Sequence, residues 1–235
     1  MIQVHPLASS SRGNAYLIDS GAAPALLLEA GLPFKELHKR IWAQDYTLDR
    51  VGGCLISHEH GDHAKAAEGL ARYGVSIYTS KGTAEALRFT SHCLKPVEAR
   101  QEFKIGPWAV LPFETIHDAA EPFGFLISDG TDKLAYVTDT AYIPVRFQGL
   151  TIAMIECNYE AAILTAARET HPEIKTRVIK NHFGLEQVIK LFEANDTSKL
   201  REVWLLHLSR GHSDAARFKS EIQKVTGVPV YIAGE

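Results

Sequence analysis

The sequence predicts a mixed α/β (α+β) fold in which two sheets pack together and helices lie outside them. Strand-like runs come in succession, with helical patterns between and after them, so neither strict strand–helix alternation nor an all-strand pattern fits. With 46% hydrophobic and 23% charged residues, the 235-residue chain has enough apolar material for a core. No repeat, low-complexity segment or long Pro/Gly linker divides it, so we expect a single domain over residues 1–235.

The first half of the chain is predicted to consist of strands interrupted by short helices. Residues 2–7 predict a strand that ends in a turn-rich loop at residues 9–14. The apolar runs at residues 15–19 and 25–29 flank a Ser-Gly pair, so we expect a hairpin there. Pro33 opens a helix with one apolar face. Four more elements are a buried strand at residues 52–57, a helix at about 64–73, a strand at 75–79 and a helix from about 82.

The second half of the chain has the same elements with more helical pattern. Apolar runs predict strands at residues 108–116, 123–128, 134–138, 152–156, 203–208 and 228–232. Periodic apolar positions predict helices at about residues 160–169, 172–180, 185–194 and 214–225. Several of these strands end in titratable side chains, and strand ends are where active sites gather in layered α/β folds.

The net charge of the chain neither indicates nor excludes nucleic acid as a partner. The formal net charge is −3 and the pI is about 6.4, but local patches matter more than totals. Lysine and arginine cluster in residues 81–100 and 175–190. We interpret these clusters first as solvated helix faces and second as surfaces that follow a phosphate backbone.

The cysteines and the first residues indicate a cytoplasmic protein. Cys54, Cys93 and Cys157 are odd in number and lack C-x-x-C spacing, so a disulfide framework is not expected. Cys54 and Cys157 lie in apolar runs, where a buried inert thiol is the simpler interpretation. The opening residues do not resemble a signal peptide, and no segment is apolar enough to suggest a membrane span.

The strongest motif is the run His58-Glu59-His60-Gly61-Asp62-His63, directly after the buried strand at residues 52–57. Alternate side chains of an extended segment point to the same side, so His58 and His60 can face one ion. Beyond the turn at Gly61, Asp62 and His63 can address a second position. Imidazole and carboxylate ligands suit zinc, and also manganese or iron. The alternative, a surface loop that is rich in histidine by chance, does not account for three histidines and an aspartate at this spacing.

Three further candidate ligands lie where predicted strands end. His117 follows residues 108–116, Asp139 follows residues 134–138, and His207 lies at the end of the strand that begins at residue 203. Each alone has a simpler interpretation, a hydrogen-bonded structural histidine or a helix-capping aspartate. Their shared position at strand ends favours a common site.

In this order, H-x-H-x-D-H followed by separate His, Asp and His resembles the metallo-β-lactamase-fold hydrolases over the whole chain. The resemblance implies a four-layer αβ/βα sandwich with a binuclear site. It assigns His58, His60 and His117 to one ion and Asp62, His63 and His207 to the other. The resemblance further implies that Asp139 bridges both ions, with a shared hydroxide as the nucleophile. The cofactors implied are two divalent ions, Zn²⁺ or Mn²⁺, with iron as a further option.

Asp139 separates branches of that superfamily. Lactamases tend to carry Cys or Ser at this position, whereas phosphodiesterase, nuclease and thioesterase branches carry Asp. Several segments are similar to the YycJ/WalJ-type branch, which is associated with 5′→3′ exonuclease activity on double-stranded DNA: residues 7–14, 117–124, 137–142 and 207–209. The chain departs from that branch at Tyr159, where His is usual, at residues 181–184, which replace a Gly-His-Leu-Ser element, and at residues 211–213, which replace an Asn pair.

Further residues are candidates for the chemistry itself. Asp62 and Asp139 can orient the attacking water or accept its proton. His182 and His212 are candidates for the acid that protonates the leaving oxygen, and the alternative for each is an ordinary helix-start or surface histidine. Asp118 can orient the His117 imidazole, or be a plain loop carboxylate.

The loop near the N-terminus is a candidate substrate-binding segment. Ser9, Ser10, Ser11 and Asn14 can present hydroxyl, amide and backbone N–H groups to a phosphate, and the alternative is a polar turn.

The resemblance implies a metal-dependent phosphodiesterase or 5′→3′ exonuclease that acts on DNA, as a monomer or a homodimer. Two alternatives stay open: a small-molecule hydrolase that cleaves a cyclic phosphodiester or a thioester, and a metal-binding scaffold without catalysis.

Overall fold

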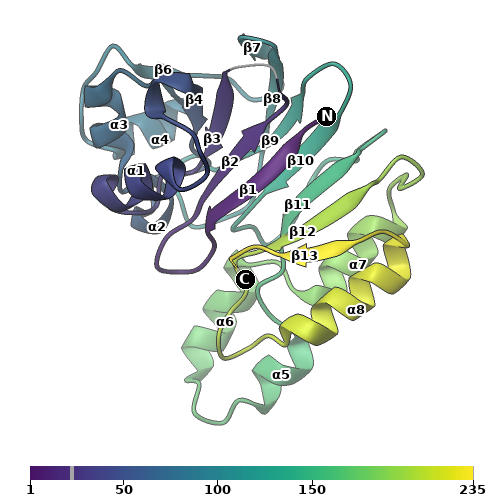
Figure 1. The fold of residues 1–235 in the computed structure, drawn as a ribbon. Helices are drawn as coiled ribbons and strands as arrows, with labels where there is room; N and C mark the ends of the chain where they lie inside the picture. Colours follow the sequence, from purple (N-terminus) through teal and green to yellow (C-terminus); the bar gives the residue numbers. More distant parts are fainter. Residues whose placement is uncertain (22–23, 235) are drawn as a thin grey trace. The chain divides into compact units, whose positions relative to one another are not determined.

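The computed structural model describes residues 1–21 and 24–234, and its ribbon is drawn in Figure 1. The chain divides into two compact units. The N-terminal unit comprises residues 1–114 and 119–132 with Gly234, and the C-terminal unit comprises residues 115–118 and 133–233.

A six-stranded sheet forms the centre of the N-terminal unit. Its strands run in the order β1 (Gln3–Ala8), β2 (Ala15–Asp19), β3 (Ala25–Leu28), β4 (Val51–Leu55), β5 (Ile77–Thr79) and β6 (Leu94–Pro96). The first three strands pair antiparallel, which confirms the hairpin expected from the apolar runs. The last four pair parallel, so β3, β4 and β5 bring their carboxyl ends to the same edge.

Short helices connect these strands and cover the sheet. They are α1 (Phe34–Trp42), the 3₁₀ turn η1 (Leu48–Arg50), α2 (Gly61–Ala64), α3 (Ala67–Tyr73) and α4 (Lys81–Ala86). Leu37, Ile41 and Leu70 on α1 and α3 belong to one buried apolar cluster with Leu27 and Ile56. Burial of such side chains contributes about 1.5–3 kcal/mol each relative to exposure.

One helix prediction in this unit is wrong. The sequence favours a continuous helix over residues 64–73, but the structure has two helices, α2 and α3, separated at Lys65 and Ala66. The Ala66 N–H donates to the Ala30 carbonyl at 2.8 Å, away from its own helix. The break follows from this contact with a distant turn, which is invisible in the local apolar pattern.

Three antiparallel strands complete the N-terminal unit: β7 (Phe103–Ile105), β8 (Trp108–Glu114) and β9 (Phe123–Ser128). The Trp108 indole N–H donates to the Pro24 carbonyl at 2.9 Å, and Phe103 stacks on Tyr78 of β5 with ring centroids 5.2 Å apart. These contacts pack the three strands against the six-stranded sheet. The three-residue strands β6 and β7 are not predicted by the sequence, because each is too short to show alternation.

Four parallel strands form the sheet of the C-terminal unit. They are β10 (Lys133–Val137), β11 (Ile152–Glu156), β12 (Glu202–Leu206) and β13 (Val230–Ile232), paired in that order. The predicted strand at residues 203–208 ends at Leu206, because His207 takes a left-handed backbone with φ 53°. The carboxyl ends of these strands share one edge, so residues that follow β10, β11 and β12 meet there.

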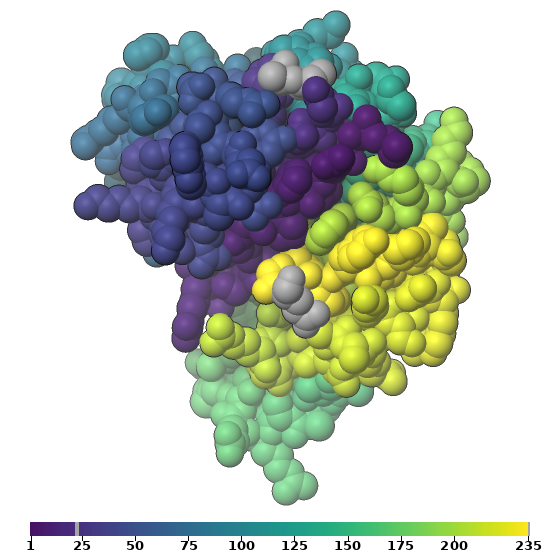
Figure 2. Space-filling model, in the orientation of Figure 1, coloured from purple at the N-terminus to yellow at the C-terminus, as the bar shows by residue number. Residues whose placement is uncertain are grey.

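The helices of this unit are α5 (Ala161–Ala166), α6 (Pro172–Asn181), α7 (Leu185–Glu193) and α8 (Ala215–Thr226). Val188 and Phe192 of α7 and Phe218 and Ile222 of α8 are buried. The outer face of α8, yellow in Figure 2, lies at the surface of its unit. Among the described residues, no helix is both long and apolar enough to cross a membrane.

Candidate metal centre

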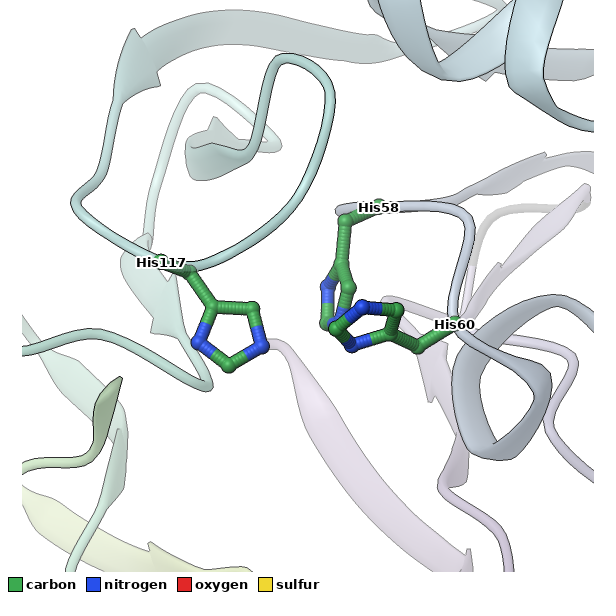
Figure 3. A group of neighbouring side chains, drawn as sticks. All are labelled: His58, His60 and His117. Carbon is green, nitrogen blue, oxygen red and sulfur yellow. The ribbon is translucent and has the colours of Figure 1, made fainter. Parts of the chain in front are cut away.

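In the N-terminal unit, the predicted histidine cluster leaves the carboxyl end of β4. His58 is buried, and its Nε2 lies 3.1 Å from Nδ1 of His60. The two rings meet edge to face, as Figure 3 shows. The Ser57 hydroxyl lies 2.8 Å from the other nitrogen of His58, Nδ1, and fixes this ring. The structure thus brings together two imidazole nitrogens that can address one ion.

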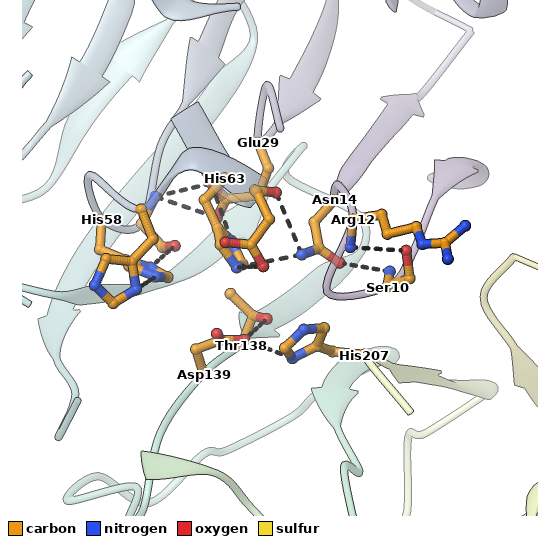
Figure 4. A network of polar contacts seen from close by, with 12 residues as sticks. Ser10, Arg12, Asn14, Glu29, His58, His63, Thr138, Asp139 and His207 are labelled. Carbon is orange, nitrogen blue, oxygen red and sulfur yellow. Dashed lines mark hydrogen bonds and ion pairs between the residues drawn. The ribbon is translucent and has the colours of Figure 1, made fainter. Parts of the chain in front are cut away.

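The second pair of the cluster lies at the start of α2. His63 is fully buried, and its Nε2 lies 3.5 Å from Oδ2 of Asp62 and 3.2 Å from Nδ2 of Asn14. On the other side of the ring, Nδ1 lies 3.7 Å from Oε2 of Glu29. Figure 4 shows His63 between Glu29 and Asn14. Two residues from other segments therefore hold the orientation of His63.

Glu29 also supports the strand that carries His58. Its buried carboxylate accepts hydrogen bonds from the Ser57 N–H at 3.2 and 3.3 Å. Glu29 itself follows β3 and has a positive φ of 63°. Since β3 and β4 are parallel neighbours, the carboxylate stands at the same sheet edge as His58. One side chain thus contacts both halves of the cluster.

Glu59 connects the motif to other segments of the N-terminal unit. One oxygen of its carboxylate, Oε1, accepts from the Ala120 N–H at 2.8 Å, and the other, Oε2, lies 3.5 Å from the Thr83 hydroxyl. Glu59 therefore ties the motif to the loop before β9 and to α4.

The predicted substrate loop at residues 9–14 forms hydrogen bonds within itself and with Tyr16. The Tyr16 hydroxyl donates to Ser9 Oγ at 2.8 Å. Ser10 Oγ accepts from the Arg12 N–H at 3.2 Å, and the Ser10 N–H donates to Asn14 Oδ1 at 3.1 Å. Asn14 is fully buried against His63, whereas Ser11 is exposed. The loop thus supports the metal ligands through Asn14, and its serines reach the surface to different degrees.

In the C-terminal unit, Asp139 lies between two histidines. Its Oδ1 is 2.9 Å from Nδ1 of His207, and its Oδ2 is 3.8 Å from Nε2 of His117. The Thr138 hydroxyl donates to Oδ1 at 3.0 Å, as drawn in Figure 4. The two oxygens face different imidazoles, so one carboxylate contacts two of the proposed ligands.

The backbone at these positions is strained. Asp139 has φ 38° and His207 has φ 53°, both outside the regions that such residues prefer. Strain of this kind costs on the order of 1–3 kcal/mol per residue and clusters at functional sites. The left-handed turn ends β10 and β12 abruptly and aims both side chains over the sheet edge.

Glu156 is the centre of the network in this unit. It is fully buried, and its Oε1 accepts from Nδ1 of His182 at 2.6 Å and from Nδ1 of His207 at 3.1 Å. Its Oε2 accepts from the N–H groups of Thr140 at 3.1 Å and Phe183 at 3.0 Å. Burial, the largest influence, opposes the charged form, but the two histidines outweigh it and lower the pKa of Glu156.

The histidines of this unit respond to the same charges. Burial lowers the pKa of His117, which favours the neutral imidazole that metal binding needs. For His182, burial is again the largest influence, but the Glu156 carboxylate outweighs it and raises the pKa. For His207, Asp139 and Glu156 together overcome burial and raise the pKa to about 10. Negative charge therefore concentrates at this edge, which suits a cation.

His117 has a clear orientation. Its Nδ1 donates to the Asn181 carbonyl at 3.0 Å, so Nε2 is the nitrogen with the lone pair. Asp118, proposed from sequence as the partner that orients this ring, lies 3.5 Å from Nε2 and pairs with Arg177 at 3.6 Å. The backbone of α6, not Asp118, holds the His117 nitrogen that faces away from Asp139.

The two candidate acids have different surroundings. His182 follows α6, is partly buried and is held by Glu156 in the same network as Asp139. His212 lies 2.9 Å from the Thr170 hydroxyl through Nε2 and 3.3 Å from the Ser209 hydroxyl through Nδ1. Both nitrogens of His212 thus hold a loop together, which leaves His182 as the candidate beside the carboxylates.

The donor sets of both units suit divalent ions. They consist of imidazole nitrogens and carboxylate oxygens, the ligands that zinc, manganese and iron accept. Within the C-terminal unit, Asp139, Glu156, His182 and His207 offer donor atoms that all lie within 4.8 Å of one another. Supporting partners fix His58, His63 and His117 by a second atom, as is usual for metal-binding histidines.

Glu29 and Glu156 are the residues that sequence reasoning missed. In the sequence, each stands at the end of an apolar strand run and belongs to no ligand motif. Each is a lone carboxylate directly after or at the end of a buried parallel strand, and each is fully buried in the structure. A charged residue in such a place needs a partner, and that signal would have identified both.

Sequence comparisons with known proteins give matches over most of the chain. A family model described as the beta-lactamase superfamily domain matches residues 16–207, a range that includes all seven proposed ligands. The chain is 29% identical over 219 residues to the exodeoxyribonuclease YycJ of Bacillus anthracis, a match that covers 86% of this chain and 81% of that one. It is 28% identical over 223 residues to the exodeoxyribonuclease WalJ of Streptococcus pneumoniae, covering 87% and 80%.

Among solved structures, the metallo-β-lactamase-fold protein YhfI from Bacillus subtilis is similar in fold. It aligns with a TM-score of 0.78 at 18% identity, over 100% of this chain and 96% of that one. At this identity the likeness shows the fold alone. The predicted fold class is confirmed.

Proposed function

Because the chain belongs to the beta-lactamase superfamily, whose members with this fold include metal-dependent hydrolases, we propose that it is a binuclear phosphodiesterase that degrades DNA from the 5′ end. The observation that carries the proposal is the arrangement of Asp139, with one carboxylate oxygen toward His207 and the other toward His117. An aspartate in this role is typical of the phosphodiesterase, nuclease and thioesterase branches. The exodeoxyribonuclease names of two relatives support the nucleic-acid substrate.

The proposed ligand set follows the motif order of the family. His58, His60 and His117 would hold one ion, Asp62, His63 and His207 would hold the other, and Asp139 would contribute to both. Bound ions of this kind lower the pKa of water and neutralise charge on a phosphate. Zinc and manganese both suit these donors.

His182 is proposed as the acid that protonates the leaving oxygen. Glu156 accepts a hydrogen bond from Nδ1 of His182 at 2.6 Å and raises the pKa of that imidazole. A raised pKa keeps the proton on the ring near neutral pH, where an acid must hold it before transfer. Asp62 and Asp139 are proposed to orient the attacking water and accept its proton.

A panel of three substrates tests this proposal. Metal-loaded protein is incubated with 5′-labelled duplex DNA, bis-p-nitrophenyl phosphate and an acyl thioester, and an Asp139→Ala variant serves as the matched inactive form. We expect labelled mononucleotide from the duplex, slower turnover of the small diester and no thioester hydrolysis. Activity on the thioester alone would contradict the proposal. Inertness toward all three with ions bound would instead favour a non-catalytic scaffold.

A further inference from the structure

A cavity of about 420 Å³ opens within the C-terminal unit, between the loop that follows β10 and helix α7. Its volume falls in the range of about 300–1,000 Å³ that is usual for small-molecule pockets. Its walls include Tyr142, Ile143, Arg146, Phe183, Lys190 and Leu191. Along the chain, the cavity adjoins the candidate metal centre, because the loop begins at Asp139 and Phe183 directly follows His182.

The walls of the cavity combine an aromatic ring, two basic side chains and apolar surface. Tyr142 is 59% exposed, so its side chain is accessible to solvent beside the cavity. Arg146 and Lys190 are exposed, and within residues 1–21 and 24–234 neither forms an ion pair. Phe183 adds a buried apolar residue to the same walls. A base stacks on an aromatic ring, and a phosphate binds to arginine and lysine.

The loop that carries Tyr142 is fixed in place. The Thr140 hydroxyl donates to the Tyr142 carbonyl at 2.7 Å, and the Gln187 side chain donates to the Ala141 carbonyl at 3.4 Å. Further along, the Phe147 N–H donates to the Asn195 side-chain oxygen at 2.6 Å. The loop is therefore tied to α7 and to the residues just beyond it. A site that is formed before its ligand arrives loses less entropy on binding.

We propose that this cavity binds one nucleotide of the DNA substrate, with the base stacked on Tyr142 and the strand phosphate held by Arg146 and Lys190. The inference rests on the proposed function, because it names the part of the chain that holds the nucleotide next to the scissile bond. It adds a binding role for three side chains that are neither metal ligands nor the proposed acid.

Binding of a deoxynucleoside monophosphate tests the assignment without turnover. The probes are dAMP and deoxyadenosine, titrated by calorimetry into metal-loaded wild type, Tyr142→Ala, Tyr142→Phe and the double variant Arg146→Glu/Lys190→Glu. Lys219→Glu on α8 is a matched charge control, since Lys219 is exposed and outside the cavity. Thermal melting checks that each variant folds.

We expect Tyr142→Ala to weaken dAMP and deoxyadenosine by about ten-fold, the effect of losing one stacking contact. Tyr142→Phe keeps the ring and should bind within about two-fold of wild type. The double charge variant should weaken dAMP at least about five-fold and leave deoxyadenosine unchanged. Wild-type affinity in Tyr142→Ala, equal losses in Tyr142→Phe, or no dAMP binding by wild type would each overturn the assignment.

The same variants separate this inference from the proposed function. If wild type degrades DNA but Tyr142→Ala keeps the wild-type KM for it, the cavity assignment is wrong and the function stands. If dAMP binding depends on Tyr142 but wild type degrades no DNA, the cavity is a nucleotide site and the proposed function is wrong.

Discussion

Glu156 is a buried carboxylate that four neighbouring groups hold at once. Two are imidazoles, from His182 and His207, and two are backbone N–H groups. A buried carboxylate with this many donors fixes the orientation of both rings. Since removing one partner of a buried polar network leaves the others unpaired, the network should respond to small changes at Glu156.

Glu156→Gln keeps the size of the side chain and removes its charge. We expect the affinity for divalent ions to fall by about 10–100-fold, because His182 and His207 lose the partner that orients them. Glu160→Gln is the matched control, since Glu160 is also buried but pairs with Arg217 at 2.9 Å. Competition with a chromogenic chelator measures the affinity. Equal affinities in wild type and Glu156→Gln would show that the carboxylate does not position the ligands.

His182→Gln tests the proposed acid. We expect kcat on duplex DNA to fall by about 10²–10⁴-fold with the metal content unchanged, because the variant loses the proton donor but no proposed ligand. His212→Gln is the control, since both nitrogens of His212 contact hydroxyls of its own loop. An unchanged kcat in His182→Gln would remove this residue from the mechanism, and a loss of ions would make it a ligand instead.

The individual site residues that can be predicted from the sequence are those that belong to a short motif or to a segment that resembles a known family. The candidates from His58 to His63 stand together in six residues, and the resemblance to a known family supplies His117, Asp139 and His207. Glu29 and Glu156 act through space on ligands that are distant in sequence, so no local pattern marks their partners. The same holds for Asn14, whose contact with His63 spans 49 positions.

At the scale of elements, three segments of the N-terminal unit cross at the start of α2. The Asn14 N–H donates to the Asp62 carbonyl at 2.7 Å, the Ala30 N–H donates to the His63 carbonyl at 2.7 Å, and the Gly31 N–H donates to the Asn14 carbonyl at 2.9 Å. The backbone itself thus positions two proposed ligands. Gly31 lies where this crossing is tightest, since a Cβ there would lie 1.7 Å from the Asp62 carbonyl oxygen.

Gly31→Ala should therefore displace the ligand loop. We expect a loss of at least about 1–3 kcal/mol in the free energy of unfolding, the usual result of overpacking, together with weaker metal binding. Gly61→Ala is the matched control, because a Cβ at Gly61 meets nothing within 4 Å among the described residues. Urea unfolding of both variants measures the difference. A Gly31→Ala protein as stable as Gly61→Ala would show that the crossing can relax freely.

The elements that the sequence predicts well are those with a repeated apolar pattern. The strands β2, β9 and β11 have the predicted bounds or differ from them only slightly, and so do α6 and α7. Errors occur where a contact outside the pattern decides the backbone. The Ala66 N–H leaves its helix for the Ala30 carbonyl, and His207 turns left-handed at the end of β12.

At the scale of the whole molecule, bound ions should stabilise the folded chain. Asp139 and Glu156 are buried close together, and each raises the pKa of His207 because of its negative charge. A divalent cation that binds only the folded state stabilises it by mass action. At about 100 times the dissociation constant this is about 2.7 kcal/mol, which corresponds to a rise in Tm of roughly 5–10 °C for a chain of this size.

Removal of the ions should reverse this stabilisation. We expect dialysis against a chelator to lower Tm by that amount and to abolish DNA hydrolysis, and zinc or manganese to restore both. Magnesium is the control ion, since it prefers all-oxygen sites. Elemental analysis checks that the ions have been removed. If Tm then stays unchanged, ion binding is not coupled to folding and the prediction is wrong.

The layered fold of the whole chain follows from the succession of strands and helices together with the resemblance in motif order. The sequence cannot supply the substrate, because substrate selection depends on surfaces such as the cavity beside Tyr142. That cavity is assembled from a loop after β10 and a helix about 45 positions later, and no local pattern in the sequence shows that the two meet.

We propose that seven side chains hold two divalent ions. The most direct test is the number of ions bound per chain, measured by elemental analysis of wild type after saturation with zinc or manganese and removal of the excess. We expect two ions per chain in wild type and at most one in Asp139→Ala, together with loss of DNA hydrolysis. One ion or none in saturated wild type, or two ions retained by Asp139→Ala, would contradict it.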